Sequence, residues 1–395
     1  FKGRGAECAL DCRMSSRPQA KPRIPGVFQP RSPEEQLSAI GIDARTGKLL
    51  HQHEYPRSNG VYGALKALLP HCSPDTDAWE DIDEPMEGEW LREQDVEDQS
   101  FLDYVQRRPQ RPDDDRHTIY ILPLYGDSQA SSSPAGAQNT DALLKFPSLQ
   151  ALQGIVSAFY QMPVQLMKFA PMSGLKFGMM ASPVREDRGF GPQWNARLIL
   201  QALQHKVPKR AYCLLAVTME DLFPRPEWNF VYGLANLSGR VGVFSFVRHD
   251  PLQGRAGTRT LQQELHLLSR SAATTLHEIG HMFGLKHCTW YNCLMRGNNG
   301  DGVEHQHAPL FLCPVCLRKL HWTVGFDIFR RYEDLATTYD KLALDEGNRY
   351  GMFSEVSCFL QQRLTKLEGC GSTALPHWQE TWLGSAAHRQ QTTQA

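Results

Sequence analysis

The sequence predicts an α+β fold with an α/β-like half, in which helices cover a mixed, mostly parallel β-sheet. Residues 211–218 (AYCLLAVT) form a nearly continuous apolar run, which is typical of a central strand buried on both faces. Residues 241–248 (VGVFSFVR) alternate as a strand with one exposed face does. A long helical pattern then covers residues 261–283. The β-α-β order of this region favours parallel strands covered by helices.

The elements before residue 211 follow the same order. Residues 118–124 (TIYILPL) are a short apolar run with strand character. Apolar residues then recur at helical spacing, at Leu149, Leu152, Val156 and Phe159. We expect a further strand at residues 164–169 and a further helix at residues 195–205.

An acidic segment precedes these elements. Residues 75–103 contain thirteen Asp or Glu residues against a single Arg. A solvated segment is the simplest interpretation of this charge, and an acidic guard or docking strip is the alternative. Large apolar side chains in and around the segment suggest that part of it packs onto the protein: Trp79, Trp90, Phe101 and Leu102.

Overall composition excludes several classes of protein. The 395 residues contain 42 Lys or Arg and 43 Asp or Glu, a net charge of −1. This balance argues against a nucleic-acid partner and against a cationic membrane-surface protein. No secretory signal is visible in the first thirty residues, so we expect an intracellular protein, cytoplasmic or nuclear. Separately, we expect a monomer. Ten cysteines are too few for a disulfide scaffold of this length.

The chemistry is concentrated in the stretch HEIGHMFGLKH, which fits HExxHxxGxxH. His277 and His281 are four residues apart on the predicted helix, so both imidazoles point to the same side and reach one tetrahedral Zn²⁺. Glu278 lies about 100° further around the helix axis, beside the metal, where a general base for a water molecule is needed. The alternative is a helix whose histidines are only half-buried and hydrogen-bonded.

Gly284 and His287 complete this motif. The chain must leave the helix sharply to return a third ligand to the same ion, and glycine adopts the left-handed conformation that does this. His287 then supplies the third ligand. Three protein ligands with an open fourth position are the pattern of a catalytic zinc site.

Four cysteines follow directly, in the pattern Cys-x4-Cys-x19-Cys-x2-Cys: Cys288, Cys293, Cys313 and Cys316. Two close pairs of thiolates predict a structural zinc site in which every position is filled, although a CxxC pair alone is also a redox motif. His305 and His307 are spare ligand candidates, but a loop surface is the simpler interpretation. Because His287 and Cys288 are adjacent, the two metals must be bound back to back. Met295 is either a core methionine or the floor beneath the three imidazoles.

The combined pattern HExxHxxGxxHC-x4-CxM-x17-CxxC resembles the signature of the archaemetzincins, zinc metallopeptidases of the metzincin clan. The resemblance is strong from Leu214 to Tyr332. It implies a metzincin-like zincin fold with an active-site helix and a four-cysteine zinc-bound loop after it. It also implies two zinc ions per chain, Glu278 as general base, Met295 as the Met-turn residue, and residues 241–248 as an edge strand that pairs with extended substrate.

The resemblance divides the chain into three expected parts. Residues 1–116 are an N-terminal extension, partly disordered, with the acidic segment; residues 117–335 are an archaemetzincin-like catalytic domain; residues 336–395 are a C-terminal helix and a flexible tail. We therefore expect a zinc metallopeptidase that hydrolyses peptides or proteins. The alternative is a catalytically silent zinc-binding interaction module of the same fold, against which the intact Glu278 speaks. Arg248 and Tyr291 are weak candidates for stabilising the oxyanion besides zinc.

Overall fold

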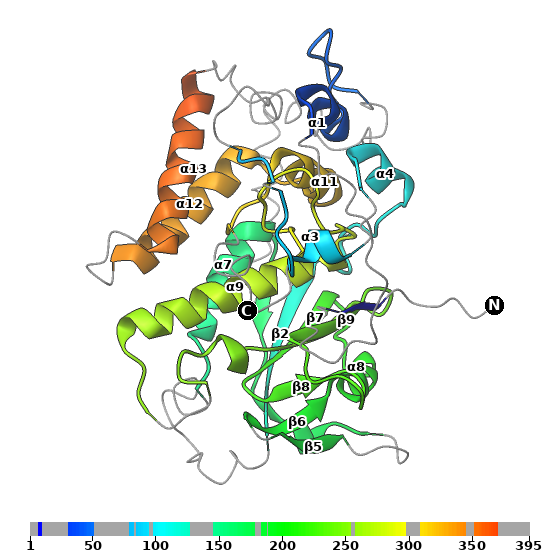
Figure 1. Ribbon diagram of the computed structural model, residues 1–395, viewed down its shortest axis with the longest axis vertical. Coiled ribbons are helices and arrows are strands. Elements are labelled where there is room, and N and C mark those ends of the chain that lie inside the picture. Colours follow the sequence, from blue (N-terminus) through cyan, green and yellow to red (C-terminus); the bar gives the residue numbers. More distant parts are fainter. Residues whose placement is uncertain are drawn as a thin grey trace, which may run out of the picture.

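The structure, a computed structural model, describes residues 7–9, 31–50, 79–82, 84–94, 98–126, 145–177, 183–187, 189–253, 257–297, 309–344 and 351–369. Figure 1 shows helix α9 (Leu261–Met282) crossing the middle of the molecule, with the β-sheets on one side and a group of helices on the other. That group contains α1 (Pro33–Ile40), α11 (Pro314–Val324), α12 (Ile328–Leu344) and α13 (Met352–Gly369). The candidate site lies where α9 meets the β-sheets and this group of helices.

The main sheet is mixed and mostly parallel, as predicted. Its strands follow the order β1 (Glu7–Ala9), β9 (Gly233–Asn236), β10 (Val241–Ser245), β7 (Ala211–Thr218), β2 (Thr118–Tyr125) and β3 (Val164–Leu166). The strands from β10 to β3 run parallel, whereas β9 is antiparallel to both β10 and β1. The short strand β4 (Ala170–Pro171) also pairs with β2. The predicted strands at 118–124 and 211–218 are confirmed.

Helices cover both faces of this sheet. Every residue of β7 is buried. Leu214 and Ala216 face the core that contains α8 (Ala196–Gln204), whereas Leu215 and Val217 face the core that contains α7 (Leu149–Tyr160) and α9. This explains the uninterrupted apolar run, because side chains of a strand alternate between two faces and here both faces are dry. The predicted helices at 149–159, 195–205 and 261–283 are confirmed as α7, α8 and α9.

One strand prediction was wrong in two respects. Strand β10 ends at Ser245, all five of its residues are buried, and it lies between β9 and β7 instead of at an edge. The alternation of small and large residues in this stretch reflects close packing, not exposure: a Cβ on Gly242 would approach the Phe244 ring and the Met282 side chain within 2.6–2.8 Å. Strand β9 pairs along its outer side, so β10 has no free edge for a substrate.

A smaller sheet lies beside the main one and consists of β5 (Val184–Asp187), β6 (Gly191–Asn195) and β8 (Asp221–Phe223). Strand β6 leads directly into α8, whose N-terminal N–H groups are capped by the Asn195 side chain. Asp221 is fully buried in this sheet and forms an ion pair with Arg248. The smaller sheet therefore fixes the segment that follows β10.

Helices α1, α3 (Trp90–Glu93) and α4 (Phe101–Gln106) show that parts of the N-terminal extension are folded against the rest of the protein. Arg318 of α11 is fully buried and donates to the carbonyls of Ile40 and Gly41, at the end of α1. Trp79 and Phe101 are also buried, as the apolar side chains of the acidic segment suggested. The expected disordered part of residues 1–116 falls largely outside the described residues.

The C-terminal helices α12 and α13 pack against each other, and α12 also contacts α7. The expected boundary after residue 335 lies inside α12, and the expected flexible tail lies outside the described residues. The division of the chain into three parts stays a prediction. Among the helices that the structure describes, none combines the length and the apolar character needed to cross a membrane.

Candidate metal centres

Helix α9 is built to end at a fixed place. It begins at a capping box, in which Thr260 and Gln263 satisfy each other's backbone N–H groups. It ends in a Schellman motif: Leu285 N–H donates to Gly280 O at 3.1 Å, and Gly284 N–H donates to His281 O at 2.8 Å. Gly284 has φ +85°, the left-handed conformation that glycine adopts without a Cβ penalty. The chain therefore turns back at the position that the motif predicted.

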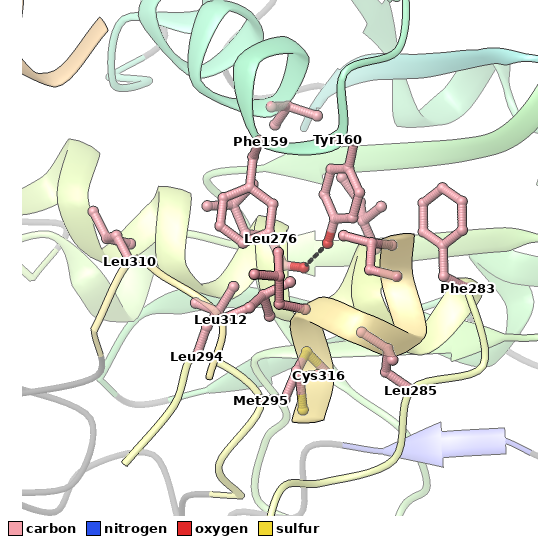
Figure 2. Close-up of a cluster of buried hydrophobic side chains, with 14 of the residues drawn as sticks. Phe159, Tyr160, Leu276, Phe283, Leu285, Leu294, Met295, Leu310, Leu312 and Cys316 are labelled. Atoms are coloured by element: carbon pink, nitrogen blue, oxygen red, sulfur yellow. Dashed lines mark hydrogen bonds between the residues drawn. The ribbon is translucent and has the colours of Figure 1, made fainter. Parts of the chain in front are cut away.

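Aromatic residues hold the C-terminal end of α9. The Phe283 ring is stacked between the rings of Tyr160 and Tyr212, at centroid distances of 5.1 Å and 4.4 Å. The Tyr160 hydroxyl donates to the carbonyl of Leu276, as Figure 2 shows, and the Tyr212 hydroxyl donates to the carbonyl of Met282 at 3.3 Å. The Met282 carbonyl belongs to the last turn, whose carbonyls lack partners within the helix, so the Tyr212 bond pairs it, and both tyrosines fix the position of the helix.

The structure brings the three predicted histidine ligands together. One ring nitrogen from each of His277, His281 and His287 lies within 4.8 Å of the others. The Nδ1 atom of His277 lies 2.8 Å from the carbonyl of Leu294, and that of His281 lies 2.6 Å from the carbonyl of Leu285. Since a carbonyl only accepts, both Nδ1 atoms carry the proton and both Nε2 atoms carry a lone pair. This tautomer is the one that a metal requires.

The spacing of the imidazoles fits a tetrahedral ion. The Nε2 atoms of His281 and His287 are 3.2 Å apart. Two nitrogens bound to one tetrahedral zinc ion lie about 3.3 Å apart, given the usual Zn–N distance. Burial, followed by the neighbouring rings of His281 and His277, lowers the pKa of His287 well below its usual range. His287 is therefore neutral near pH 7, as a metal ligand must be.

The four predicted cysteines also form a single cluster. All four are buried and their sulfur atoms lie within 4.8 Å of one another. The Sγ atoms of Cys288 and Cys313 are 3.7 Å apart, and two thiolates on one tetrahedral zinc are expected at about 3.8 Å. Cys313 is the N-cap residue of α11 and Cys316 lies in the first turn, where the helix dipole favours negative charge. The Cys313 N–H donates to Cys293 Sγ at 3.3 Å.

The thiols of this cluster shift one another's pKa values. Burial raises the pKa values of Cys293 and Cys313 well above the usual range, and the neighbouring sulfurs add to the shift. For Cys288, burial also raises the pKa, but contacts with the other three thiols outweigh it and bring the pKa well below its usual value. Four buried sulfur atoms this close together are the ligand set of a tetrahedral metal site.

Met295 lies between the two clusters. Its carbonyl accepts a hydrogen bond from Cys288 N–H at 2.7 Å, and its side chain is fully buried beneath α9. A Cβ on Gly280 would approach the Met295 sulfur to 2.5 Å, so any larger residue at this point of the helix displaces the Met295 side chain. Figure 2 shows the Met295 and Cys316 side chains on the opposite side of Leu276 from Tyr160. Met295 therefore packs against α9, next to the cysteine cluster.

The remaining predicted site residues are placed as follows. Glu278 is buried, with 1% of its surface exposed, on the helix turn that carries His277 and His281. Arg248 donates twice to Asp221, at 2.7 Å and 2.8 Å, and its guanidinium stacks on Phe230, so it is engaged in a structural network. Tyr291 is buried in the loop between Cys288 and Cys293. His305 and His307 lie outside the described residues.

Sequence reasoning missed the contribution of the acidic segment to this site. The Trp90 ring of α3 lies against His287, and the buried side chain of Gln99 contacts the turn between α9 and His287. The apolar residues of the segment were the available signal that it packs onto something. No local pattern indicated what it packs against, because its partners lie almost 200 residues away in the sequence.

Known proteins resemble this chain in the same region. The model of peptidase family M54 matches residues 210–322. Archaemetzincin-2 of Macaca fascicularis is 33% identical over 251 residues, which are 58% of this chain and 65% of that protein. Archaemetzincin-2 of Homo sapiens is 30% identical over 334 residues, which are 79% of this chain and 87% of that protein. The crystal structure of an archaemetzincin from Methanopyrus kandleri is 23% identical, covers 53% of this chain and 97% of its own, and has a TM-score of 0.37.

The histidine and cysteine clusters, together with the match to a peptidase family, define the class of this protein as a zinc metallopeptidase. Within that class, the chain belongs to the archaemetzincin family, peptidase family M54. This agrees with the resemblance drawn from the sequence motif.

Proposed function

We propose that this chain hydrolyses peptide bonds at a zinc ion held by His277, His281 and His287, with Glu278 as the general base. We further propose that Cys288, Cys293, Cys313 and Cys316 hold a second, structural zinc ion and that Met295 is the floor of the histidine site. The observation that carries the proposal is the convergence of three imidazoles, two of which have their Nδ1 protons fixed on backbone carbonyls. Such fixed tautomers leave the metal-facing nitrogens free of protons.

The chemistry divides between the metal and the protein. Zinc, when bound, supplies the Lewis acidity that acidifies a water molecule and polarises a scissile carbonyl. The Glu278 carboxylate accepts the proton of that water and returns it to the amine of the departing peptide. Its position on α9, one residue after His277, keeps it beside the ion and away from the ligand set. The substrate is a peptide or protein, as the family's class implies.

The test replaces Glu278 with Gln and compares it with Glu264→Gln as a matched control. Glu264 lies on the same helix, in its first turn, is 41% exposed and pairs with Arg259 at 3.1 Å. Glu278→Gln should keep two zinc ions and the fold while hydrolysis of a peptide library falls by a factor of about 10² or more, the usual contribution of a general base. Glu264→Gln should hydrolyse the library as fast as the unmodified protein.

Three results count against the proposal. Equal hydrolysis by Glu278→Gln and the unmodified protein rejects Glu278 as the base. Two zinc ions by native mass spectrometry with no chelator-sensitive hydrolysis favours the silent interaction module. One zinc ion, or none, means that a ligand set is wrongly assigned.

A further inference from the structure

We propose that Gln99, from the acidic N-terminal segment, is a positioning residue for the third catalytic ligand, His287. This inference rests on the proposed function, since it takes His287 to be a zinc ligand. It extends the active site to a part of the chain that lies outside the zinc motif and outside the region matched by the family model. It also assigns a task to the acidic segment, which the sequence left as a solvated stretch.

Gln99 spans the turn between α9 and His287. Its side-chain amide is buried, with 2% of the residue exposed. The Nε2 group donates to the carbonyl of Gly284 at 3.2 Å, and the Oε1 atom accepts from the N–H of Lys286 at 3.1 Å. The two backbone groups lie on either side of Leu285, directly before His287. A single side chain therefore fixes both ends of the segment that delivers the third imidazole.

This segment needs such support because of its own composition. Gly284 is the residue that lets the chain reverse, and a glycine permits many other backbone conformations as well. The Gly284 carbonyl lies beyond the end of α9, so it accepts no hydrogen bond within the helix. The hydrogen bonds from Gln99 select the one conformation that places His287 next to His281. They pair a backbone carbonyl and a backbone N–H at a partly buried position.

The orientation of the amide is determined by its partners. The Lys319 ammonium donates to the Gln99 backbone carbonyl and to Oε1, the latter at 3.3 Å. The Lys319 ammonium and the backbone N–H of Lys286 can only donate, so both must face the oxygen of the Gln99 amide. The nitrogen must then face the Gly284 carbonyl. This orientation of the amide satisfies all three contacts, and the flipped orientation does not.

Lys319 also connects Gln99 to the cysteine cluster. It is buried on α11, one turn after Cys316, and the first residues of that helix carry Cys313 and Cys316. Gln99 is thus in contact with the helix that holds one metal centre and with the turn that presents a ligand to the other. The turn is held from both sides, by the Schellman motif of α9 and by an amide anchored on α11.

The test uses cobalt(II) in place of zinc, because cobalt takes the same ligands and its absorption spectrum distinguishes imidazole from thiolate ligands. Gln99→Met keeps the length of the side chain and removes its three hydrogen bonds, with Gly284, Lys286 and Lys319. Gln99→Glu keeps the acceptor for Lys286 and gives Lys319 a counter-charge, so it preserves folding while losing the donor to Gly284. The control is Gln153→Met, which removes a single amide-to-carbonyl hydrogen bond, to Val164 at 2.8 Å, on the distant helix α7.

We expect Gln99→Met to weaken metal binding at the histidine site by about tenfold to a hundredfold, as removal of an orienting partner does elsewhere. Its visible cobalt bands from the imidazole site should change, while the thiolate bands and the affinity of the cysteine site stay as in the unmodified protein. The metal affinity of the histidine site in Gln99→Glu should lie between those of Gln99→Met and the unmodified protein. Gln153→Met should leave both sites unchanged.

Two outcomes overturn the inference while leaving the proposed function intact. The first is unchanged affinity and unchanged imidazole bands in both Gln99 variants. The second is an equal loss at both metal sites in both variants, which identifies a general packing role instead of a positioning one. Failure of the proposed function looks different: the unmodified protein itself would then bind no cobalt at the histidines.

Discussion

The indole ring of Trp90 lies edge-on against the imidazole of His287, with 4.1 Å between ring centroids and 75° between ring planes. Trp90 belongs to the short helix α3, whose neighbour Glu89 pairs with Arg296 at 3.3 Å on the zinc loop. The fit is close, since a Cβ on Gly297 would collide with the indole ring of Trp90. The acidic segment therefore covers His287, the one histidine of the cluster that lies outside α9.

Trp90→Ala should release zinc from the histidine site faster. An edge-to-face aromatic contact contributes about 0.5–1.5 kcal/mol beyond the area it buries, which corresponds to a severalfold and up to about tenfold change in rate. The measurement is zinc transfer to a coloured chelator, which should show a fast and a slow phase for the two sites. Only the phase of the histidine site should change. Trp90→Phe keeps an aromatic edge, so release as fast as in Trp90→Ala would contradict this explanation.

Cys316→Ser should disable the histidine site although it leaves all three histidines in place. Structural zinc sites of this kind contribute directly to folding, and the loop between Cys288 and Cys313 contains Leu294, whose carbonyl orients His277. We expect the zinc content to fall, the melting temperature to drop and hydrolysis to be lost. Cys358→Ser is the matched control, because Cys358 is exposed on α13. Full hydrolysis with one zinc ion would show that the two centres are independent.

Gly280→Ala should destabilise the protein by about 1–3 kcal/mol, the usual cost of adding a methyl group to a filled core. The new Cβ would meet the Met295 sulfur at 2.5 Å and push it away from the histidine site. Gly154→Ala provides the opposite case, since this glycine of α7 has open space around its Cβ position. That change should stabilise the protein by about 0.5–1 kcal/mol. Denaturant unfolding measures both, and equal effects would refute the assigned role of Gly280.

Acidification should destabilise the protein through His321 of α11. Burial, followed by the charge of Arg318, lowers the pKa of this imidazole from 6.5 to about 4. A histidine whose pKa is lowered by folding takes up its proton more readily in the unfolded protein. Its contribution to the free energy of unfolding is therefore complete above pH 6.5 and is lost as the pH falls towards 4. The loss amounts to about 3 kcal/mol.

The measurement for this prediction is the free energy of unfolding between pH 7 and pH 4, with excess zinc present throughout. In the His321→Gln variant no group titrates at this position. Its free energy of unfolding should therefore fall by about 3 kcal/mol less than that of the unmodified protein over the same pH range. Parallel curves for the two proteins would show that His321 does not cause the pH dependence.

The parts that the sequence predicted are those in which the partners are close along the chain. The histidines lie within eleven residues on one helix and one turn, and the spacing alone determines that they meet. The cysteines form two local pairs. The buried strand β7 and helix α9 are predictable from their hydrophobic patterns, because the faces that pack on the core require apolar residues.

The parts that it did not predict depend on distant partners. Strand β9 is four residues long, contains Gly233 and Asn236 and shows no strand pattern, yet its pairing decides that β10 lies inside the sheet. Gln99 and Trp90 likewise belong to a segment whose charge suggests solvent. Their roles follow from contacts with Lys286 and His287 that only the folded chain creates.

The wrapping of the N-terminal segment around the zinc loop has a consequence for biosynthesis. The bonds from Arg318 to Ile40 and from Lys286 to Gln99 join residues 278 and 187 positions apart. During synthesis, Ile40 and Gln99 therefore leave the ribosome well before their partners Arg318 and Lys286. Contacts of such separation form late, so metal capture is expected to be the closing step of maturation.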